Sequence, residues 1–403
     1  MVSKKPELYI ATIGRPTKGD TGVQTHIRAF MQYVAEQGMA ARLLTPFDLT
    51  PLVVYPVFGI GRLVKLLGTA PWVWWYRSGH LTLLRYALMR ALHPEAPSIV
   101  YAQDPLSAKA ALDAKDAGYR IDVVLVVHSP ISQADEWVEN GYVRRAGWLY
   151  QRIARLEEDV IPRVDRLVFP SEFVQRGVHR RIAGAGRVPS WRVPNVAVRG
   201  TGTSTDSGRA DVISIGPLVP NKNHEFLIRV LAEAHRLGYR YRLTIVGAGP
   251  LLGRLRELVA RSGLNAYVAM PGYVPDAARL LANHRVYAHA ARIENCCVSV
   301  LEALAAGKPV LAAPTGGIPE QITDGVEGFY WPLTDPVSAA DRLIRLLDDA
   351  ALYERMSRAA RARYERHFAP KIVMPRLIEA VLGSSEPASS DRIQRGRHRD
   401  AVC

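Results

Sequence analysis

Two glutamates in this chain are spaced to hold a phosphorylated sugar. Glu294 and Glu302 lie eight residues apart in ENCCVSVLEALAAGKPV, around a helix predicted to begin near Cys297. The first N–H groups of such a helix lack intrahelical acceptors and carry partial positive charge, so a diphosphate could dock there. Glu294 could then accept hydrogen bonds from sugar hydroxyls, and Glu302, one turn into the helix, could reach a second polyol such as a ribose. The alternative interpretation is a surface helix with two solvated carboxylates.

The pattern around these glutamates defines the helix and the strand that follows it. Val298, Leu301 and Ala305 form an apolar helical face, Gly307 follows the helix end, and Pro309 separates it from a new apolar strand. Similar apolar, β-branched runs alternate with helical patterns along the whole chain, which predicts an α/β fold of parallel sheets wrapped by helices. In such sheets ligands bind beyond the carboxyl ends of the strands.

The chain length predicts two domains, because 403 residues exceed one ordinary hydrophobic core. We expect two doubly wound, Rossmann-like domains at residues 1–198 and 211–368, facing each other across a cleft. The polar segment RGTGTSTDSGRA at 199–210 is predicted to link them. We expect a helix at 369–383 to pack back on the first domain, and the tail at 384–403 to be disordered.

Three further strand ends are predicted to reach the cleft. Lys222 follows one strand in SIGPLVPNKNHEF and could meet a diphosphate. His128 ends the apolar run DVVLVVHSP and could bond a sugar hydroxyl. Gly19 and Gly22, in the loop after the first strand, could allow a close approach of a phosphate or sugar. Each of these residues alone is typical of an ordinary turn or helix start.

The sequence lacks the motifs of several other classes of functional site. The turn Gly247-Ala248-Gly249-Pro250 lacks the third glycine of a dinucleotide fingerprint, and neither a Walker A sequence nor a Gly-x-Ser-x-Gly elbow is present. There is no Asp-x-Asp pair, and among the remaining histidines His26, His224, His284 and His289 are scattered and match no metal spacing. The sequence therefore predicts neither a metal site nor a serine nucleophile.

Composition and charge restrict the partners and the compartment. Three cysteines, with Cys296 and Cys297 adjacent and Cys403 at the end, form no disulfide framework, so we expect a reducing cytoplasm. No apolar run is long enough to span a membrane. The net charge is +14, and residues 1–200 hold 26 Lys and Arg against 17 Asp and Glu. This surplus favours an anionic partner, such as a nucleotide diphosphate or an acidic membrane face, whereas no nucleic-acid motif is present.

Residues 51–92 allow two interpretations. The segment mixes aromatic and arginine residues with a helical leucine stripe; these are Trp72, Trp74, Trp75, Tyr76, Arg62, Arg77, Arg85, Arg90, Leu81, Leu84, Leu88 and Leu92. Such a segment could lie in a membrane interface at the inner face of the membrane. It could equally form helices packed on the first sheet with arginines at the rim, which we slightly favour.

The ordered motif series resembles the retaining, nucleotide-sugar-dependent glycosyltransferases of the GT-B fold, family 4, also called group 1. The resemblance covers nearly the whole chain. Its strongest part is an ordered series of five segments: SIGPLVPNKNHEFL, IVGAGP, PGYV, ENCCVSVLEALAAGKPV and APTGGIPEQITDGVEGFY. The family's segment that leads into the second domain is similar to VFPSEFVQRG with the following VPN.

The resemblance implies a role for individual residues. Glu294 would bond the donor sugar, Glu302 the ribose and Lys222 the diphosphate, with His128 near the donor sugar. The other implied substrate-binding residues are Gly22, as the close-approach glycine, Tyr273 and Val274, whose backbone would read the base, and Cys297, Val298 and Ser299, whose amides would face the sugar and diphosphate. Two positions depart from the family pattern. Pro217 stands where an arginine usually accompanies the lysine, which leaves the diphosphate to Lys222, helix amides or Arg292, and Cys296-Cys297 replaces the common Phe-Gly.

The implied activity is metal-independent transfer of a hexosyl group from a nucleotide-diphosphate sugar to an acceptor hydroxyl, with retained configuration and no further cofactor. The resemblance favours a UDP-sugar over a GDP-sugar. The acceptor would be a lipid carrier, a polysaccharide or a small metabolite. Two alternatives stay open on the same scaffold, namely a sugar-nucleotide epimerase and a non-catalytic sugar-nucleotide-binding subunit.

Overall fold

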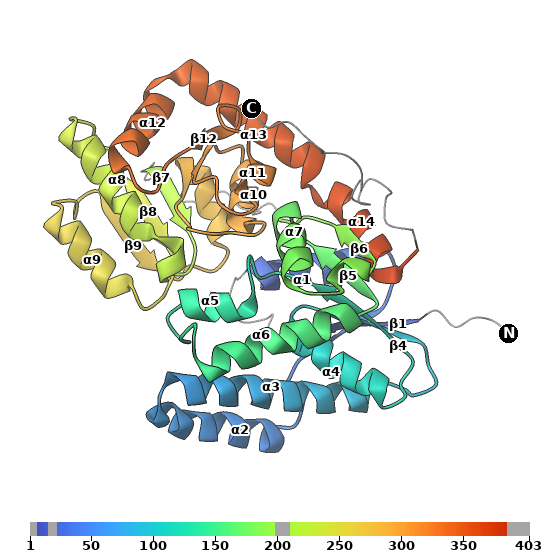
Figure 1. Cartoon of the computed structure of the whole chain (residues 1–403). Helices are drawn as coiled ribbons and strands as arrows, with labels where there is room; N and C mark the ends of the chain where they lie inside the picture. The colour runs from blue at the N-terminus through green and yellow to red at the C-terminus, as the bar shows by residue number, and fades with distance from the viewer. Residues whose placement is uncertain (1–5, 15–21, 198–209, 385–403) are drawn as a thin grey trace, which may run out of the picture.

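A computed structural model describes residues 6–14, 22–197 and 210–384 of the chain. Its architecture is two layered α/β domains placed side by side (Figure 1). The predicted α/β class with two doubly wound domains is therefore confirmed. The predicted linker and tail, together with Gly19 and Cys403, lie outside the described residues, apart from Ala210 and Ser384.

The first domain contains one parallel sheet, in the order β2-β1-β3-β4-β5-β6 within the described ranges. Its strands are β1 (Glu7–Ala11), β2 (Ala41–Leu44), β3 (Ser98–Ala102), β4 (Ile121–Val126), β5 (Arg166–Phe169) and β6 (Ser190–Arg192). Its helices are α1 (Gly22–Glu36), α2 (Pro51–Val64), α3 (Thr69–Ala91), α4 (Pro105–Asp116), α5 (Gln133–Glu139), α6 (Trp148–Val160) and α7 (Glu172–Arg181), with short 3-10 turns η1 (Lys65–Leu67), η2 (Ile161–Arg163) and η3 (Ala185–Arg187). Every residue of β3 is buried, as expected of a central strand covered on both faces.

The second domain repeats this plan with the strand order β12-β11-β10-β7-β8-β9. Its strands are β7 (Ala210–Ile215), β8 (Leu243–Val246), β9 (Val268–Gly272), β10 (His284–His289), β11 (Val310–Ala312) and β12 (Gly328–Tyr330). Its helices are α8 (His224–Arg236), α9 (Leu252–Arg261), α10 (Val298–Ala305), α11 (Ile318–Gln321), α12 (Pro336–Asp348) and α13 (Ala350–His367), with 3-10 turns η4 (Pro220–Lys222) and η5 (Ala277–Asn283).

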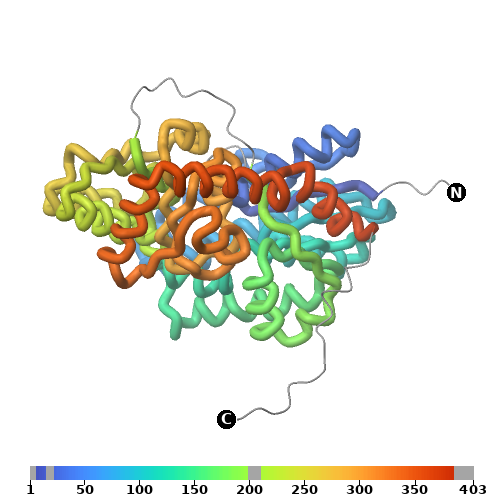
Figure 2. Tube along the Cα trace, turned by 90° about the horizontal axis from the view of Figure 1, so that it is seen from above, coloured from blue at the N-terminus to red at the C-terminus, as the bar shows by residue number. Residues whose placement is uncertain are grey.

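The C-terminal helices connect the two domains. After α13 the chain crosses to the first domain, where α14 (Pro370–Leu382) covers one face of the first sheet beside α1 (Figure 2). Val373, Met374 and Leu377 are fully buried in the same core cluster as Ile10 and Phe30. At the crossing, the Tyr364 hydroxyl donates to the carbonyl of Ala197, at 2.8 Å. Burial of this apolar surface holds the two domains together.

The segment 51–92 forms the antiparallel pair α2 and α3 at the outer edge of the first domain (Figure 1). Leu84, Leu88 and Leu92 are buried against the first sheet, so the leucine stripe of α3 belongs to the core as we favoured. Arg77 departs from the expected rim position, because it is buried and its guanidinium donates to Gln133 Oε1 at 3.0 Å. No helix in the described ranges combines the length and apolarity needed to cross a bilayer.

Candidate active site

Loops from both domains converge on Glu294. The residue lies in the loop between β10 and α10, and its carboxylate pairs with the Lys222 ammonium from η4. A second cation, His289, ends β10 and places Nε2 3.3 Å from Glu294 Oε1. The structure thus brings together Glu294 and Lys222, which the sequence analysis names, and adds His289, which that analysis set aside. Applying to His289 the same strand-end rule that selected His128 would have found it.

The charges in this cluster are mutually stabilised. Burial disfavours the ionised form of Glu294, but Lys222 and His289 outweigh burial and lower the pKa of Glu294 to about 2. Burial likewise opposes charge on His289, yet Cys297 and Glu294 raise the pKa of His289 to about 9. Burial also opposes charge on Lys222, and Glu294 raises the Lys222 pKa above its usual value. At neutral pH the site therefore holds an ionised carboxylate between two cations.

The loop that carries Lys222 is built on close backbone contacts. A Cβ at Gly247 or Gly249 would overlap the carbonyls of Gly216 and Leu218, so only glycine lets the turn after β8 pack on the loop after β7. Asn221 then ties this loop to that of Glu294, because its side chain donates to Ile293 O at 3.1 Å and accepts from Ile293 N at 3.3 Å. The glycine turn thus positions Lys222 opposite Glu294.

Helix α10 begins where the sequence predicts. Cys297 is its N-cap, and Gly307 beyond its end has φ +66°, the left-handed conformation that glycine tolerates. One expectation for this helix is wrong. The Cys297 N–H does not face a donor, because it donates to Gln321 Oε1 at 2.9 Å, and Gln321 Nε2 returns a bond to Cys297 O. The amides of Val298 and Ser299, in the first turn of α10, remain the ones that can meet a diphosphate.

Asn295 joins the two domains at the site. Its side-chain amide donates to the carbonyls of Val127 and His128, at 3.1 and 3.0 Å, and its Oδ1 accepts from Ser171 Oγ at 2.6 Å. These partners all belong to the first domain, so the residue after Glu294 ties the Glu294 loop to that domain. Neither Asn295 nor Gln321 carries a sequence signal, because their partners are distant in sequence and only the fold brings them near.

The other predicted first-domain residues also lie at this junction. His128 follows β4, and its Nε2 lies 3.2 Å from Gln103 Oε1; burial and the neighbouring His26 hold the pKa of His128 well below its usual value. A neutral His128 can share a proton with a hydroxyl without adding charge. Gly22 begins α1, and a Cβ there would lie 3.1 Å from Val298 Cγ2, so α1 approaches α10 closely at this glycine.

The remaining predicted residues lie in α10 and after β9. Glu302 lies one turn into α10 and contributes to the electrostatic environment of Tyr287. Ser299 Oγ accepts from the Tyr287 hydroxyl at 2.6 Å. Tyr273 and Val274 follow β9 at the edge of the second sheet, where Tyr273 is half exposed and Val274 packs partly against the domain core. These positions fit a ligand that extends from the cluster to the sheet edge.

Comparison with known proteins assigns the family. A sequence model of Glycosyl transferases group 1 matches residues 202–363, and one of Glycosyltransferase Family 4 matches residues 21–191. Together these matches cover most of the chain. The chain belongs to the group 1 glycosyltransferases. Its GT-B fold agrees with solved structures, which include Anabaena Alr3699/HepE in complex with UDP (16% identity, TM-score 0.66, 94% of this chain and 100% of that chain). They also include sucrose-phosphate synthase from Thermosynechococcus elongatus (16%, TM-score 0.72, 95% and 100%).

Curated relatives of this group 1 glycosyltransferase match over shorter segments. Alpha-D-kanosaminyltransferase of Streptomyces kanamyceticus is 29% identical over 154 residues, which is 38% of this chain and 40% of that protein. The GDP-mannose-dependent alpha-(1-6)-phosphatidylinositol monomannoside mannosyltransferase of Mycolicibacterium smegmatis is 35% identical over 137 residues, 32% of this chain and 36% of that protein. The chain therefore aligns with less than half the length of these relatives.

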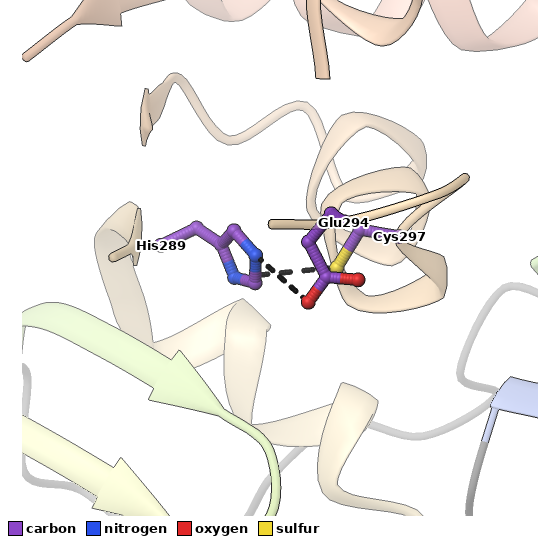
Figure 3. Close-up of side chains that lie close together, drawn as sticks. All are labelled: His289, Glu294 and Cys297. Atoms are coloured by element: carbon purple, nitrogen blue, oxygen red, sulfur yellow. Dashed lines mark hydrogen bonds and ion pairs between the residues drawn. The ribbon is translucent and has the colours of Figure 1, made fainter. Parts of the chain in front are cut away.

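The same cluster offers possible metal ligands to this glycosyltransferase. His289, Glu294 and Cys297 each offer one atom that could bind a metal, and these three atoms lie within 4.8 Å of one another (Figure 3). However, the Lys222 ammonium already pairs with Glu294 and would repel a cation. The two imidazole nitrogens also face different partners, Nε2 toward Glu294 and Nδ1 toward Cys297 Sγ at 4.0 Å. A single ion can use only one of them, so we assign the cluster to charge pairing, and metal independence stays a prediction.

Substitution of Gly316 should displace Glu294. A Cβ at Gly316, which has φ +59°, would lie 1.8 Å from the Glu294 carbonyl oxygen, so Gly316→Ala forces the Glu294 loop to move. Gly325→Ala is the matched control, because Gly325 has φ +77° and open space around its Cβ. We expect the control to cost about 1–2 kcal/mol of unfolding free energy from backbone strain alone. Gly316→Ala should cost more and also lower turnover, as thermal unfolding and donor consumption would show; equal effects would contradict the close approach.

The raised pKa of His289 should appear in the pH dependence of stability. Since the pKa is about 9 in the folded protein and about 6.5 when unfolded, the contribution of charged His289 is complete below about pH 6.5 and is lost as pH rises through 9. We expect the difference in Tm between wild type and His289→Gln to be largest near pH 6 and to shrink above pH 9. A difference that stays constant across thermal melts in this range would show that His289 is not held charged.

Proposed function

We propose that the chain transfers a hexosyl group from a nucleotide-diphosphate sugar, with a UDP-sugar favoured, to an acceptor hydroxyl with retention of configuration and without a metal ion. The observation that carries the proposal is the ionised Glu294 held between Lys222 and His289 at the N-terminus of α10, at the junction of the two domains. A donor placed there would meet cationic and amide groups at its diphosphate and a carboxylate at its sugar.

Different residues are assigned to the diphosphate, the sugar and the ribose of the donor. Lys222, which now pairs with Glu294, can exchange that carboxylate for the diphosphate, and the first-turn amides of Val298 and Ser299 add partial positive charge. Glu294 is then released to accept hydrogen bonds from sugar hydroxyls, while Glu302 reaches the ribose. His289 stays beside Glu294 and keeps it ionised.

The reaction needs charge stabilisation more than a protein base. The bond between the anomeric carbon and the diphosphate oxygen breaks with its electron pair leaving on the diphosphate. The acceptor oxygen bonds the same face of that carbon, and its proton passes to the departing phosphate. The protein positions both substrates and stabilises the charge on the leaving group. This agrees with a site in which Glu294, Lys222 and His289 neutralise one another's charge.

Product analysis tests the proposed function. The protein would be incubated in EDTA with UDP-sugars and GDP-sugars, because one curated relative is GDP-mannose-dependent by name. A panel of lipid, polysaccharide and small-molecule acceptors completes the assay, and proton NMR reports the anomeric configuration of the product. We expect an α-linked donor to give an α-linked product. An inverted product, or full loss of activity in EDTA, would refute the mechanism, and an altered donor released without acceptor would instead indicate an epimerase.

A further inference from the structure

Among the residues that the structure describes, the most exposed large apolar side chains lie on α2 and η1. We call Leu52, Tyr55, Leu63, Leu66 and Leu67 the outer face of α2. These are the five most exposed large apolar side chains in the described residues, with exposed fractions of 87, 69, 66, 83 and 76%. Within α2, Leu52, Tyr55 and Leu63 are three and eight residues apart, which places them on one face of the helix; Leu66 and Leu67 follow in η1. An exposed apolar stripe of this kind marks an interaction surface.

Helix α2 is firmly held on its opposite face. Trp75 Nε1 donates to Val57 O at 2.7 Å, and Val54 is buried against α3. A Cβ at Gly79 would lie 2.6 Å from Val57 Cγ1, so the two helices approach as closely as glycine allows. The outer face of α2 is therefore presented by a rigidly packed helix pair at the edge of the domain (Figure 1).

The charge of this helix pair matches an anionic surface. Residues 49–94 contain no Asp or Glu. Exposed Arg62 and Lys65 belong to the same helix and turn as the apolar stripe. Arg85 and Arg90 are exposed on α3, where Arg85 also pairs with Asp113 of α4 at 3.7 Å. Lys65 also lies over the Trp72 ring, 5.8 Å from its centroid. Exposed leucines flanked by cations and aromatic rings suit the headgroup region of an anionic bilayer better than a protein partner, which would require complementary acids in a defined pattern.

An aromatic chamber opens beside this face. A cavity of about 630 Å³ is lined by the rings of Phe47, Tyr55, Phe58, Tyr76 and His80, with Arg62 as its cation. Tyr55 belongs both to the chamber and to the outer face of α2, so the two surfaces are continuous. Aromatic walls with one guanidinium suit an amphiphile that carries an anionic headgroup.

The chamber also reaches toward the active site. Ile13 and Gly14, which follow β1 at the carboxyl edge of the first sheet, contribute to its lining. His128 follows β4 at the same edge, and one strand, β3, separates β1 from β4. Two strand spacings amount to about 10 Å, which a headgroup can span.

We propose that α2 and η1 dock on an anionic bilayer and that the chamber receives a membrane lipid with a phosphate-containing headgroup as the acceptor. This inference rests on the proposed transferase function and names its acceptor class. The lipid's apolar part would contact the chamber rings, its phosphate would pair with Arg62, and its headgroup hydroxyl would point toward His128 and the donor sugar.

Vesicle flotation tests the docking step. The probes are vesicles of phosphatidylcholine alone and with about one third phosphatidylglycerol, at low and high salt. We expect the wild type to float with the anionic vesicles at low salt and less at high salt. For the triple variant Leu52→Glu/Leu63→Glu/Leu66→Glu, the fraction of protein bound to anionic vesicles should fall roughly tenfold. Glutamate is repelled by the anionic surface and is costly to bury. The matched control Leu237→Glu/Val326→Glu/Val337→Glu, whose residues are exposed in the second domain, should float like wild type.

A photoactivatable phosphatidylglycerol in these vesicles tests the chamber. Gly59 lines the chamber and has open space at its Cβ, so Gly59→Trp should fill the cavity without disturbing α2. We expect wild type to be labelled on peptides containing Phe47, Phe58 or Tyr76, and Gly59→Trp to float normally but lose that labelling. Gly253→Trp, which also faces open space, is the control.

Two outcomes would overturn the inference. One is a wild type that fails to float with anionic vesicles, or a triple variant that floats equally well. The other is labelling confined to the outer face of α2. Nucleotide-sugar binding, measured separately by thermal shift, distinguishes failure of this inference from failure of the proposed function, because the proposed donor ligands Lys222 and Glu294 belong to the second domain and not to α2.

Discussion

Replacing Glu294 by glutamine should lower kcat at least a hundredfold. Glutamine keeps the shape of the side chain but removes the charge that Lys222 and His289 hold in place. The carboxylate is the group expected to bond the sugar hydroxyls as positive charge develops at the anomeric carbon. Loss of one such preorganised interaction commonly costs about 3 kcal/mol in the barrier, which is roughly a hundredfold in rate.

Glu225→Gln provides the control for this experiment. Glu225 is also a partly buried glutamate of the second domain, but it belongs to α8 and its carboxylate pairs with Arg254, at 2.7 Å, and Arg229, at 4.0 Å. Steady-state donor turnover measures both variants, and circular dichroism with thermal melts checks their folding. A folded Glu294→Gln protein with wild-type kcat would exclude Glu294 from the reaction.

Lys222→Ala should lower kcat by a similar factor, because Lys222 is expected to bind the diphosphate rather than the sugar of the donor. The family resemblance places Pro217 where a second cation is common, so we expect the diphosphate to depend strongly on Lys222. We expect kcat to fall about a hundredfold, because the leaving diphosphate would lose the cation that stabilises its charge. The variant should also be less stable, since Glu294 would lose one of its two cationic partners.

The comparison for this variant is Lys308→Ala, which removes a partly exposed lysine just after α10 in the same domain; its ammonium donates to Ala282 O at 3.5 Å. Donor turnover and KM for the nucleotide sugar would be measured for both proteins. If Arg292 replaces Lys222 on the diphosphate, Lys222→Ala will retain near wild-type kcat, and Arg292→Ala will show the loss instead.

The sequence predicts the fold better than it predicts the details of the site. Alternating strands and helices are local patterns, so the two parallel sheets and the start of α10 at Cys297 follow from them. Glu294 and Lys222 could be found because each follows a predicted strand. The pairing between them joins residues 72 positions apart and depends on the packing of Gly247 and Gly249 against a neighbouring loop.

The remaining site features depend on contacts that no local pattern encodes. The Cys297 amide donates to the side chain of Gln321, which lies 24 residues away in the sequence. The Asn295 side chain donates to carbonyls of the other domain. Likewise, the leucine pattern of residues 51–92 could not show that α3 is buried while the outer face of α2 is exposed. Each of these outcomes is set by tertiary packing, which sequence periodicity does not contain.

Calorimetric titration of the donor and of its free nucleoside diphosphate tests the central claim most directly. The claim assigns the diphosphate to Lys222 and the sugar to Glu294. We therefore predict that Lys222→Ala weakens binding of both ligands at least tenfold. Glu294→Gln should weaken only the nucleotide sugar and leave the free diphosphate bound as tightly as in wild type, or more tightly because Lys222 is released. Unchanged nucleotide-sugar affinity in both variants would contradict the assignment of this site.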